Sequence, residues 1–221
     1  METNFKSITL AETPFQSIQG EGRTAGRPCH FIRVAECNKK CHFCDTPYDR
    51  SPIQFDLGHW LETEYKQSPI KNILVTGGEP LLFQHLLKYL TEEMDGSGRL
   101  IVETNGSLPI DKGIDSWARS VRVDSITISP KSLVDLKLAC TRFKKDLFNI
   151  NFKLIYGIKE FDAMIDFLES SYADLQDYLW IMPLGSTSKE LQANSKEAAV
   201  YCIKKGYKLS GRNHICPWKI A

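Results

Sequence analysis

Short runs of branched apolar residues alternate along the chain with longer segments in which apolar residues recur with the period of a helix. This alternation is typical of parallel strands joined by crossover helices. We therefore expect an α/β fold. The predicted strands cover residues 29–34, 73–76, 100–104, 125–129, 151–155 and 179–183, with a seventh near Tyr207.

Two of the longer segments are predicted to be amphipathic helices that pack on the core. Each carries a set of apolar residues on one helical face. In residues 80–94 the set is Leu82, Leu86, Leu87 and Leu90, and in residues 188–205 it is Leu191, Ala199 and Ile203. We find no internal repeat and no low-complexity linker, so a single domain over residues 1–221 is expected.

Composition and charge narrow the classes of function. The chain has 221 residues, of which 42% are hydrophobic, enough for a substantial core. Lys and Arg number 28 against 27 Asp and Glu, so charge gives no reason to expect binding to nucleic acid or an anionic membrane. No apolar run of about eighteen residues occurs, which excludes a membrane-spanning helix. Small-molecule chemistry is the default expectation.

The number of cysteines and the N-terminal sequence indicate the cellular compartment of the protein. The chain has seven cysteines, an odd number, and no charged region followed by an apolar one at its N-terminus. No disulfide framework is implied, so we expect a cytoplasmic protein with reduced thiols.

Cys37, Cys41 and Cys44 lie together in the segment CNKKCHFC. Three thiolates at this spacing can bind three irons of a 4Fe-4S cluster and leave the fourth iron open to an exchangeable ligand. Two plainer interpretations remain open: a zinc site completed by His42 or His30, and unligated cysteines buried in the core.

Polar and glycine motifs follow several predicted strands, where functional groups of parallel α/β barrels collect. They are TGGEP at 76–80, ETNG at 103–106 and SPK at 129–131. In the first, two glycines allow close approach of the backbone, Glu79 can accept from an ammonium group, and Pro80 can begin a helix. In the last, Ser129 and Lys131 offer a hydroxyl and a cation to a carboxylate. Each motif alone is also compatible with a simple turn.

The cysteine segment followed by a strand-terminal GGEP resembles the radical S-adenosylmethionine (SAM) superfamily. The resemblance implies that the three cysteines hold a 4Fe-4S cluster whose open iron binds SAM, and that the reduced cluster cleaves SAM to a 5′-deoxyadenosyl radical. It places Phe43 near the adenine and Gly78 and Glu79 at the methionine end. It also assigns Ser129 and Lys131 to SAM.

The flanking segments FQSIQGEGRTAGRPCHFIRVAEC and CDTPY, with SPK and WIMPLGST, resemble the 7-carboxy-7-deazaguanine synthases over almost the whole chain. The resemblance implies an incomplete TIM-type barrel of about six parallel strands, with short substrate-binding extensions at both ends. It implies ring contraction of 6-carboxytetrahydropterin with loss of ammonia, dependent on SAM and Mg²⁺, in queuosine biosynthesis. It further implies a homodimer and flavodoxin or ferredoxin as electron donor.

The chemistry of a pterin suggests where the substrate binds. Its polar edge needs amide-like partners, which Gln19 and the backbone of Ile18 and Gly20 can supply, with Glu21 as a further candidate. Arg33 is a suitable cation for the substrate carboxylate.

Three further residues are assigned by the resemblance. Thr76 corresponds to a substrate-contacting threonine, and Thr46 to a magnesium ligand, although a turn hydroxyl is the plain alternative for Thr46. Ala221 would place a terminal carboxylate near the substrate.

No residue is assigned as a conventional acid, base or nucleophile. The radical is expected to remove the hydrogen at the carboxylate-bearing carbon, while the protein positions the substrate and excludes water. All five histidines are expected to be surface or core residues, although His214 near the C-terminus remains of interest; they are His30, His42, His59, His85 and His214. Two alternatives stay open: a glycyl-radical enzyme activase, and a zinc-binding module without catalysis.

Overall fold

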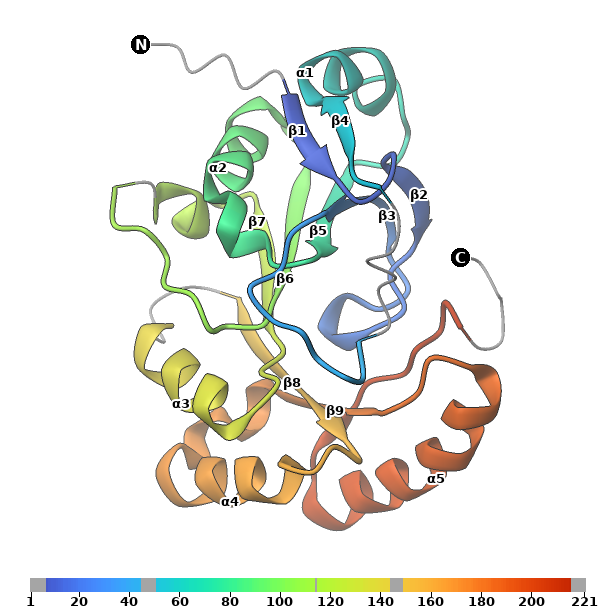
Figure 1. Ribbon diagram of the computed structural model, residues 1–221, viewed down its shortest axis with the longest axis vertical. Helices are drawn as coiled ribbons and strands as arrows, with labels where there is room; N and C mark the ends of the chain where they lie inside the picture. Colours follow the sequence, from blue (N-terminus) through green and yellow to red (C-terminus); the bar gives the residue numbers. More distant parts are fainter. Residues whose placement is uncertain (1–6, 45–50, 114, 144–148, 216–221) are drawn as a thin grey trace. The chain divides into compact units, whose positions relative to one another are not determined.

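The computed structural model describes residues 7–44, 51–113, 115–143 and 149–215 (Figure 1). The chain forms two compact units. The first comprises Met1–Ser17, Pro28–Thr104 and Leu108–Ile126, and the second comprises Ile18–Arg27, Asn105–Ser107 and Thr127–Ala221. The single-domain interpretation stays a prediction.

The first unit is built on three parallel strands. β3 (Pro28–Val34) pairs with β5 (Asn72–Gly77), which pairs with β6 (Arg99–Thr104). In register, Arg33 lies opposite Thr76 and Val34 opposite Gly77. Shorter strands extend this sheet: β1 (Ser7–Leu10) runs antiparallel to β3 and to β4 (Ile53–Asp56), and β2 (Phe15–Ile18) pairs with β3.

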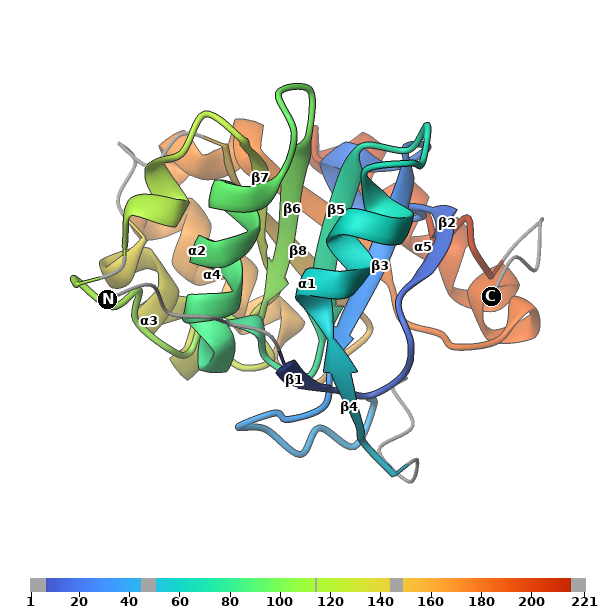
Figure 2. The same ribbon diagram turned by 90° about the horizontal axis from the view of Figure 1, so that it is seen from above.

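The parallel strands are apolar on both faces, as expected where helices cover a sheet. Ile32, Ile73, Val75 and Leu100 have no exposed surface. Helix α1 (Leu57–Trp60) continues into a π turn at Leu61–Tyr65, and α2 (Gln84–Glu93) follows a 3-10 turn at Pro80–Phe83. Both helices lie on the same side of β3, β5 and β6 (Figure 2). The core of the unit therefore lies between these helices and the strands.

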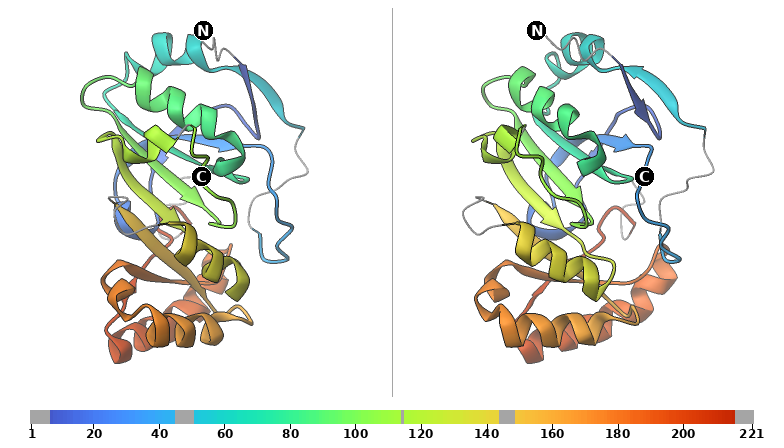
Figure 3. Two further views of the ribbon diagram at one scale, coloured as in Figure 1. Left: turned by 90° about the vertical axis from the view of Figure 1, so that its left-hand side faces the viewer. Right: turned by 60° about the vertical axis from the view of Figure 1, so that its left-hand side comes forward.

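In the second unit, β8 (Ile150–Tyr156), β9 (Leu179–Pro183) and β10 (Lys208–Leu209) run parallel. Its helices are α3 (Leu133–Arg142), α4 (Phe161–Ser171) and α5 (Ser188–Lys205). Helices α4 and α5 lie on one side of β9 (Figure 3). The remaining strand, β7 (Val123–Ile128), begins in the first unit and ends in the second.

The predicted α/β class is confirmed, and each predicted strand is present with its ends shifted by a few residues at most. The short β10 corresponds to the seventh strand near Tyr207. Three strands were not predicted: β1, β2 and β4. Each has only four residues, and polar residues interrupt the apolar ones in the sequences SITL, FQSI and IQFD, so none contains a continuous apolar run.

The predicted helical faces need two corrections. Leu82 is 44% exposed because it lies in the 3-10 turn before α2, outside the α-helical period. In α5, Leu191 is buried as predicted, but Ile203 is 84% exposed and Ala199 is only partly buried; the helix buries Ala198 and Cys202 in their place. At about 100° per residue, Ile203 lies about 120° around the helix from Leu191. The apolar face predicted for residues 188–205 was therefore too wide.

Among the described residues, no helix combines the length and the apolarity needed to cross a membrane.

Candidate functional site

The three-cysteine loop follows β3 directly. Cys37 and Cys41 are half-buried and Cys44 is exposed, and the Cys44 N–H donates to the Cys41 carbonyl at 3.1 Å in a tight turn. Within the described ranges, no three His, Cys, Asp or Glu side chains are gathered as a metal-binding group. The donor set nevertheless suits an iron–sulfur cluster, because three accessible thiols lie on one short loop.

The glycine pair of β5 packs against the base of this loop. Gly77 has φ +102°, and a Cβ at Gly78 would lie 1.8 Å from the Glu36 carbonyl oxygen. The Gly78 N–H donates to Val34 O at 2.9 Å and the Glu79 N–H donates to Glu36 O at 2.7 Å. Both glycines are therefore required by close backbone packing between the end of β5 and the chain leading to Cys37.

Glu79 connects the ends of two strands. Its side chain is fully buried, and Oε1 accepts from the Leu81 N–H at 2.9 Å and from the Thr104 hydroxyl at 2.6 Å. It thereby caps the 3-10 turn begun by Pro80 and links the end of β5 to the end of β6. Nearby, the Thr76 hydroxyl donates to Glu103 Oε2 at 3.4 Å. The structure thus brings Thr76, Gly78 and Glu79 to the edge of the sheet from which the cysteine loop leaves.

Arg33 of β3 also lies near this edge, opposite Thr76 of β5. Its Nε donates to Glu12 Oε1 at 2.8 Å, and its guanidinium carbon lies 5.8 Å from the centre of the Phe15 ring. Its side chain is 31% exposed. Sequence reasoning did not identify Glu12, because nothing in the local sequence links residue 12 to residue 33.

In the second unit, the segment Ile18–Arg27 forms a closed loop. The Gln19 N–H donates to Arg27 O at 2.8 Å, and the Gly26 N–H donates to Gln19 O at 2.7 Å. The Gln19 side-chain Oε1 accepts from the Glu21 N–H at 3.4 Å. Gln19 and Glu21 are both buried.

The Glu21 carboxylate lies among cations. Oε2 accepts from Lys153 Nζ of β8 at 2.5 Å, Oε1 accepts from Arg212 Nε at 2.8 Å, and His214 Nε2 lies 3.8 Å from Oε1. Burial by itself would raise the pKa of the Glu21 carboxyl, but the Lys153 and Arg212 cations outweigh burial and hold that pKa well below its usual range. Glu21 is therefore an anion at neutral pH.

Lys153 and Arg212 were missed by sequence analysis. A signal existed for the first, because Lys153 is the single charged residue in the otherwise apolar or amide-bearing strand INFKLIY. A buried lysine in such a strand needs an anionic partner.

The chain near the C-terminus packs on the same loop. The Asn213 N–H donates to Gly20 O at 3.1 Å, and the Gly22 N–H donates to Ser210 Oγ at 2.8 Å. A Cβ at Gly20 would lie 2.2 Å from His214 Nδ1. The structure therefore brings together the predicted residues Gln19, Gly20 and Glu21, and places His214 against them.

The SPK turn follows β7. Lys131 Nζ donates to the buried Ser129 hydroxyl at 3.0 Å, so the turn joins one hydroxyl and one cation as predicted.

Phe43 makes an edge contact with His42, with ring centres 4.9 Å apart. His30 is a core residue packed against Trp60 and Tyr65, and burial lowers its pKa. Thr46 and Ala221 lie outside the described residues.

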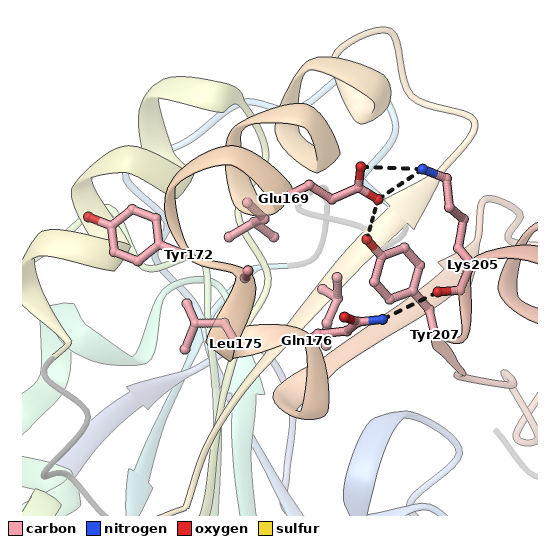
Figure 4. A pocket seen from close by; sticks show the side chains of 9 residues that line it. Glu169, Tyr172, Leu175, Gln176, Lys205 and Tyr207 are labelled. Atoms are coloured by element: carbon pink, nitrogen blue, oxygen red, sulfur yellow. Dashed lines mark hydrogen bonds and ion pairs between the residues drawn. The ribbon is translucent and has the colours of Figure 1, made fainter.

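A separate pocket of about 200 Å³ lies in the second unit between α4, α5 and β9 (Figure 4). None of its lining residues was predicted to be functional. The Glu169 carboxylate accepts from Lys205 Nζ at 3.0 Å and from the Tyr207 hydroxyl at 2.6 Å, so these polar groups satisfy one another. We interpret this pocket as part of the packing between α4 and α5.

Comparisons with known proteins agree with these observations. The Radical SAM superfamily model matches residues 32–162. A 7-carboxy-7-deazaguanine synthase from Clostridium acetobutylicum is 30% identical over 183 residues, covering 80% of this chain and 75% of that protein. One from Pyrobaculum aerophilum is 26% identical over 209 residues, covering 92% of each chain.

Among solved structures, the crystal structure of QueE from Escherichia coli aligns with a TM-score of 0.65 and 20% identity, covering 92% of this chain and 93% of that one. This likeness shows the fold, the predicted incomplete TIM-type barrel. The superfamily match spans more than half of the sequence and includes all three loop cysteines. The chain therefore belongs to the radical SAM superfamily, and within it to the family of 7-carboxy-7-deazaguanine synthases.

Proposed function

We propose that this chain is a 7-carboxy-7-deazaguanine synthase, which converts 6-carboxy-5,6,7,8-tetrahydropterin into 7-carboxy-7-deazaguanine and releases ammonia. One observation in particular supports this proposal: the three-cysteine loop and the GGE segment of β5 pack on each other at one edge of a parallel sheet. The relatives that carry this name align over most of the chain.

In this proposal, Cys37, Cys41 and Cys44 hold a 4Fe-4S cluster. When bound, the cluster and SAM supply a 5′-deoxyadenosyl radical that removes one hydrogen from the substrate. Gly78 and Glu79 meet the methionine end of SAM, and Thr104 fixes Glu79 through a buried hydrogen bond. Phe43 contacts the adenine.

Ser129 and Lys131 also bind SAM in this proposal, as the hydroxyl and cation that the SPK turn joins. They complete the set of SAM-binding residues assigned to the described part of the chain.

The substrate is proposed to contact the loop that contains Gln19 and Glu21. Gln19 and the backbone of Ile18 and Gly20 match the donors and acceptors of a pterin edge. The Glu21 carboxylate, which is anionic at neutral pH, suits the donor groups of that edge.

Four further residues are proposed to bind the substrate or the metal ion that assists the reaction. Arg33 binds the substrate carboxylate in competition with Glu12, and Thr76 adds a hydroxyl at the same sheet edge. Thr46 is proposed to bind Mg²⁺, and Ala221 to bring the terminal carboxylate near the substrate.

The protein partners remain proposals on family grounds. We propose a cytoplasmic homodimer that receives electrons from flavodoxin or ferredoxin, because a cluster on an accessible loop can be reduced by a small redox protein. Size-exclusion chromatography with light scattering tests the dimer, and reduction of the cluster by each purified donor tests the electron supply.

The test of the reaction is an anaerobic assay of reconstituted protein with SAM, Mg²⁺, a reductant and the pterin, followed by mass spectrometry. Both 7-carboxy-7-deazaguanine and 5′-deoxyadenosine are expected. Cys41→Ala should abolish both products. Cys140→Ala is the matched control, because burial raises the pKa of that thiol to about 11 and leaves it protonated and inert.

A further inference from the structure

Lys153 is a buried cation to which the reaction proposed above assigns no role. Its side chain is 4% exposed, and it lies on β8 between the buried residues Phe152 and Leu154. Removing an ammonium group from water is costly unless an anion and further hydrogen bonds compensate. The Glu21 carboxylate, 2.5 Å away, provides that anion.

Arg212 holds the other oxygen of the same carboxylate. Its side chain is 8% exposed, its Nε donates to Glu21 Oε1 at 2.8 Å, and its Nη1 donates to the Gly185 carbonyl. A guanidinium with two directional hydrogen bonds fixes the carboxylate in orientation as well as in charge. Glu21 is thus held from two sides by cations of separate segments.

These contacts tie three segments together: the loop Ile18–Arg27, strand β8, and residues 210–214. Two further hydrogen bonds reinforce the connection: the Gly22 N–H donates to the Ser210 side-chain oxygen, and the Asn213 N–H donates to the Gly20 carbonyl. Gly20 has no room for a side chain beside His214. The conformation of the loop that carries Gln19 therefore depends on the charges that hold Glu21.

We propose that Lys153 and Arg212 are positioning residues for the pterin: through Glu21 they hold the loop Ile18–Arg27 in the conformation that presents Gln19 and Glu21 to the substrate. This inference rests on the proposed function for the identity of the substrate. The arrangement of the loop itself does not depend on that identity.

The decisive variant is Lys153→Met, which keeps an unbranched side chain and removes the charge. The KM for the pterin should rise about tenfold, because one displaced charged hydrogen bond is worth about 1.4 kcal/mol, which corresponds to a factor of ten. The kcat, and the 5′-deoxyadenosine formed at saturating pterin, should change by less than about twofold. Lys153→Arg should restore much of the affinity.

A double-mutant cycle tests whether Lys153 acts through Glu21. In a Glu21→Gln background, Lys153→Met should change KM by less than about twofold, since the partner charge is already absent. The matched control is Lys205→Met, which removes another paired lysine of the same unit, 3.0 Å from Glu169. It should leave KM unchanged. An effect of Lys153→Met that persists in Glu21→Gln would overturn the proposal.

Hydrogen exchange of the same proteins separates this inference from the reaction. In Lys153→Met, amides of residues 18–27 should exchange faster, while those of α2 should not change. If the wild type makes no 7-carboxy-7-deazaguanine, the proposed function fails and the exchange result alone decides whether Lys153 orders the loop. Unchanged exchange with unchanged KM refutes the positioning role. If Lys153→Met does not fold, Arg212→Gln provides the same comparison.

Discussion

Replacement of Gly78 by alanine should displace the cysteine loop. A Cβ at Gly78 would lie 1.8 Å from the Glu36 oxygen and 2.4 Å from its carbonyl carbon, whereas real Cβ contacts are essentially never below 3.0 Å. Because the obstructing atoms belong to the backbone, no side-chain rotation relieves the clash. The two chain segments must separate by more than about 1 Å.

The magnitude of this effect follows from two terms. Overpacking of a close contact costs about 1–3 kcal/mol. Separation also weakens the 2.7 Å hydrogen bond from Glu79 N–H to Glu36 O, which is worth about 1 kcal/mol. We expect Gly78→Ala to lower the free energy of unfolding by about 3 kcal/mol.

Urea unfolding of the metal-free protein measures this loss, and iron and sulfide analysis after reconstitution measures the effect on the loop. Gly96→Ala is the matched control, because nothing lies within 4 Å of a Cβ at Gly96. Iron content should fall in Gly78→Ala alone. If Gly78→Ala unfolds at the same urea concentration as Gly96→Ala and binds as much iron, the packing argument is wrong.

Three further predictions concern polar contacts. Thr104→Val removes the 2.6 Å hydrogen bond to buried Glu79 and should lower the free energy of unfolding by about 2 kcal/mol in urea titrations, whereas Thr63→Val on the surface should have little effect. The pKa of the Glu21 carboxyl is lower in the folded protein than its value of 4.5 in the unfolded chain. The charged carboxylate therefore stabilises the fold above pH 4.5, and this stabilisation is lost as the pH falls below 4.5 toward the pKa in the folded protein. Wild type should therefore be more stable than Glu21→Gln at pH 7, with the difference shrinking in unfolding experiments at successively lower pH; a constant difference would contradict this assignment. Glu12→Gln removes the ion pair between Glu12 and Arg33, whose side chains are each about one-third exposed. Because such a pair is weak, the KM for the pterin should fall by no more than about threefold. Arg33→Met should raise the KM for the pterin.

Local sequence signals predicted much of the fold. Helix α5 begins with a capping box in which Thr187 and Glu190 exchange hydrogen bonds, and ends before Gly206 at φ +75°, so its bounds match the predicted 188–205. The longer parallel strands were found because most contain a short run of branched apolar residues, such as ILV in β5 and LIV in β6. β1 and β4 were missed because four residues of mixed polarity form strands only through pairing with each other and, for β1, with β3.

The residues of the candidate site likewise fall into those that a local sequence pattern reveals and those that it does not. Cys37, Cys41 and Cys44 are recognisable because their spacing is local, and Gly78 because it belongs to a contiguous motif. Lys153 and Arg212 bind the Glu21 carboxylate although they lie 132 and 191 positions after Glu21 in the sequence. Such pairs are created by tertiary folding: the local sequence marks Lys153 as a lysine in a buried strand, but it does not specify Glu21 as the partner.

The anaerobic reaction of the reconstituted protein with SAM, reductant, Mg²⁺ and 6-carboxytetrahydropterin tests the central claim most directly. We expect 7-carboxy-7-deazaguanine and 5′-deoxyadenosine to appear together, in Cys140→Ala as in the wild type, and neither to appear in Cys41→Ala. Formation of 5′-deoxyadenosine without 7-carboxy-7-deazaguanine would keep the radical chemistry and contradict the assigned substrate. Absence of both from protein that carries a full complement of iron and sulfide would contradict the enzymatic assignment itself.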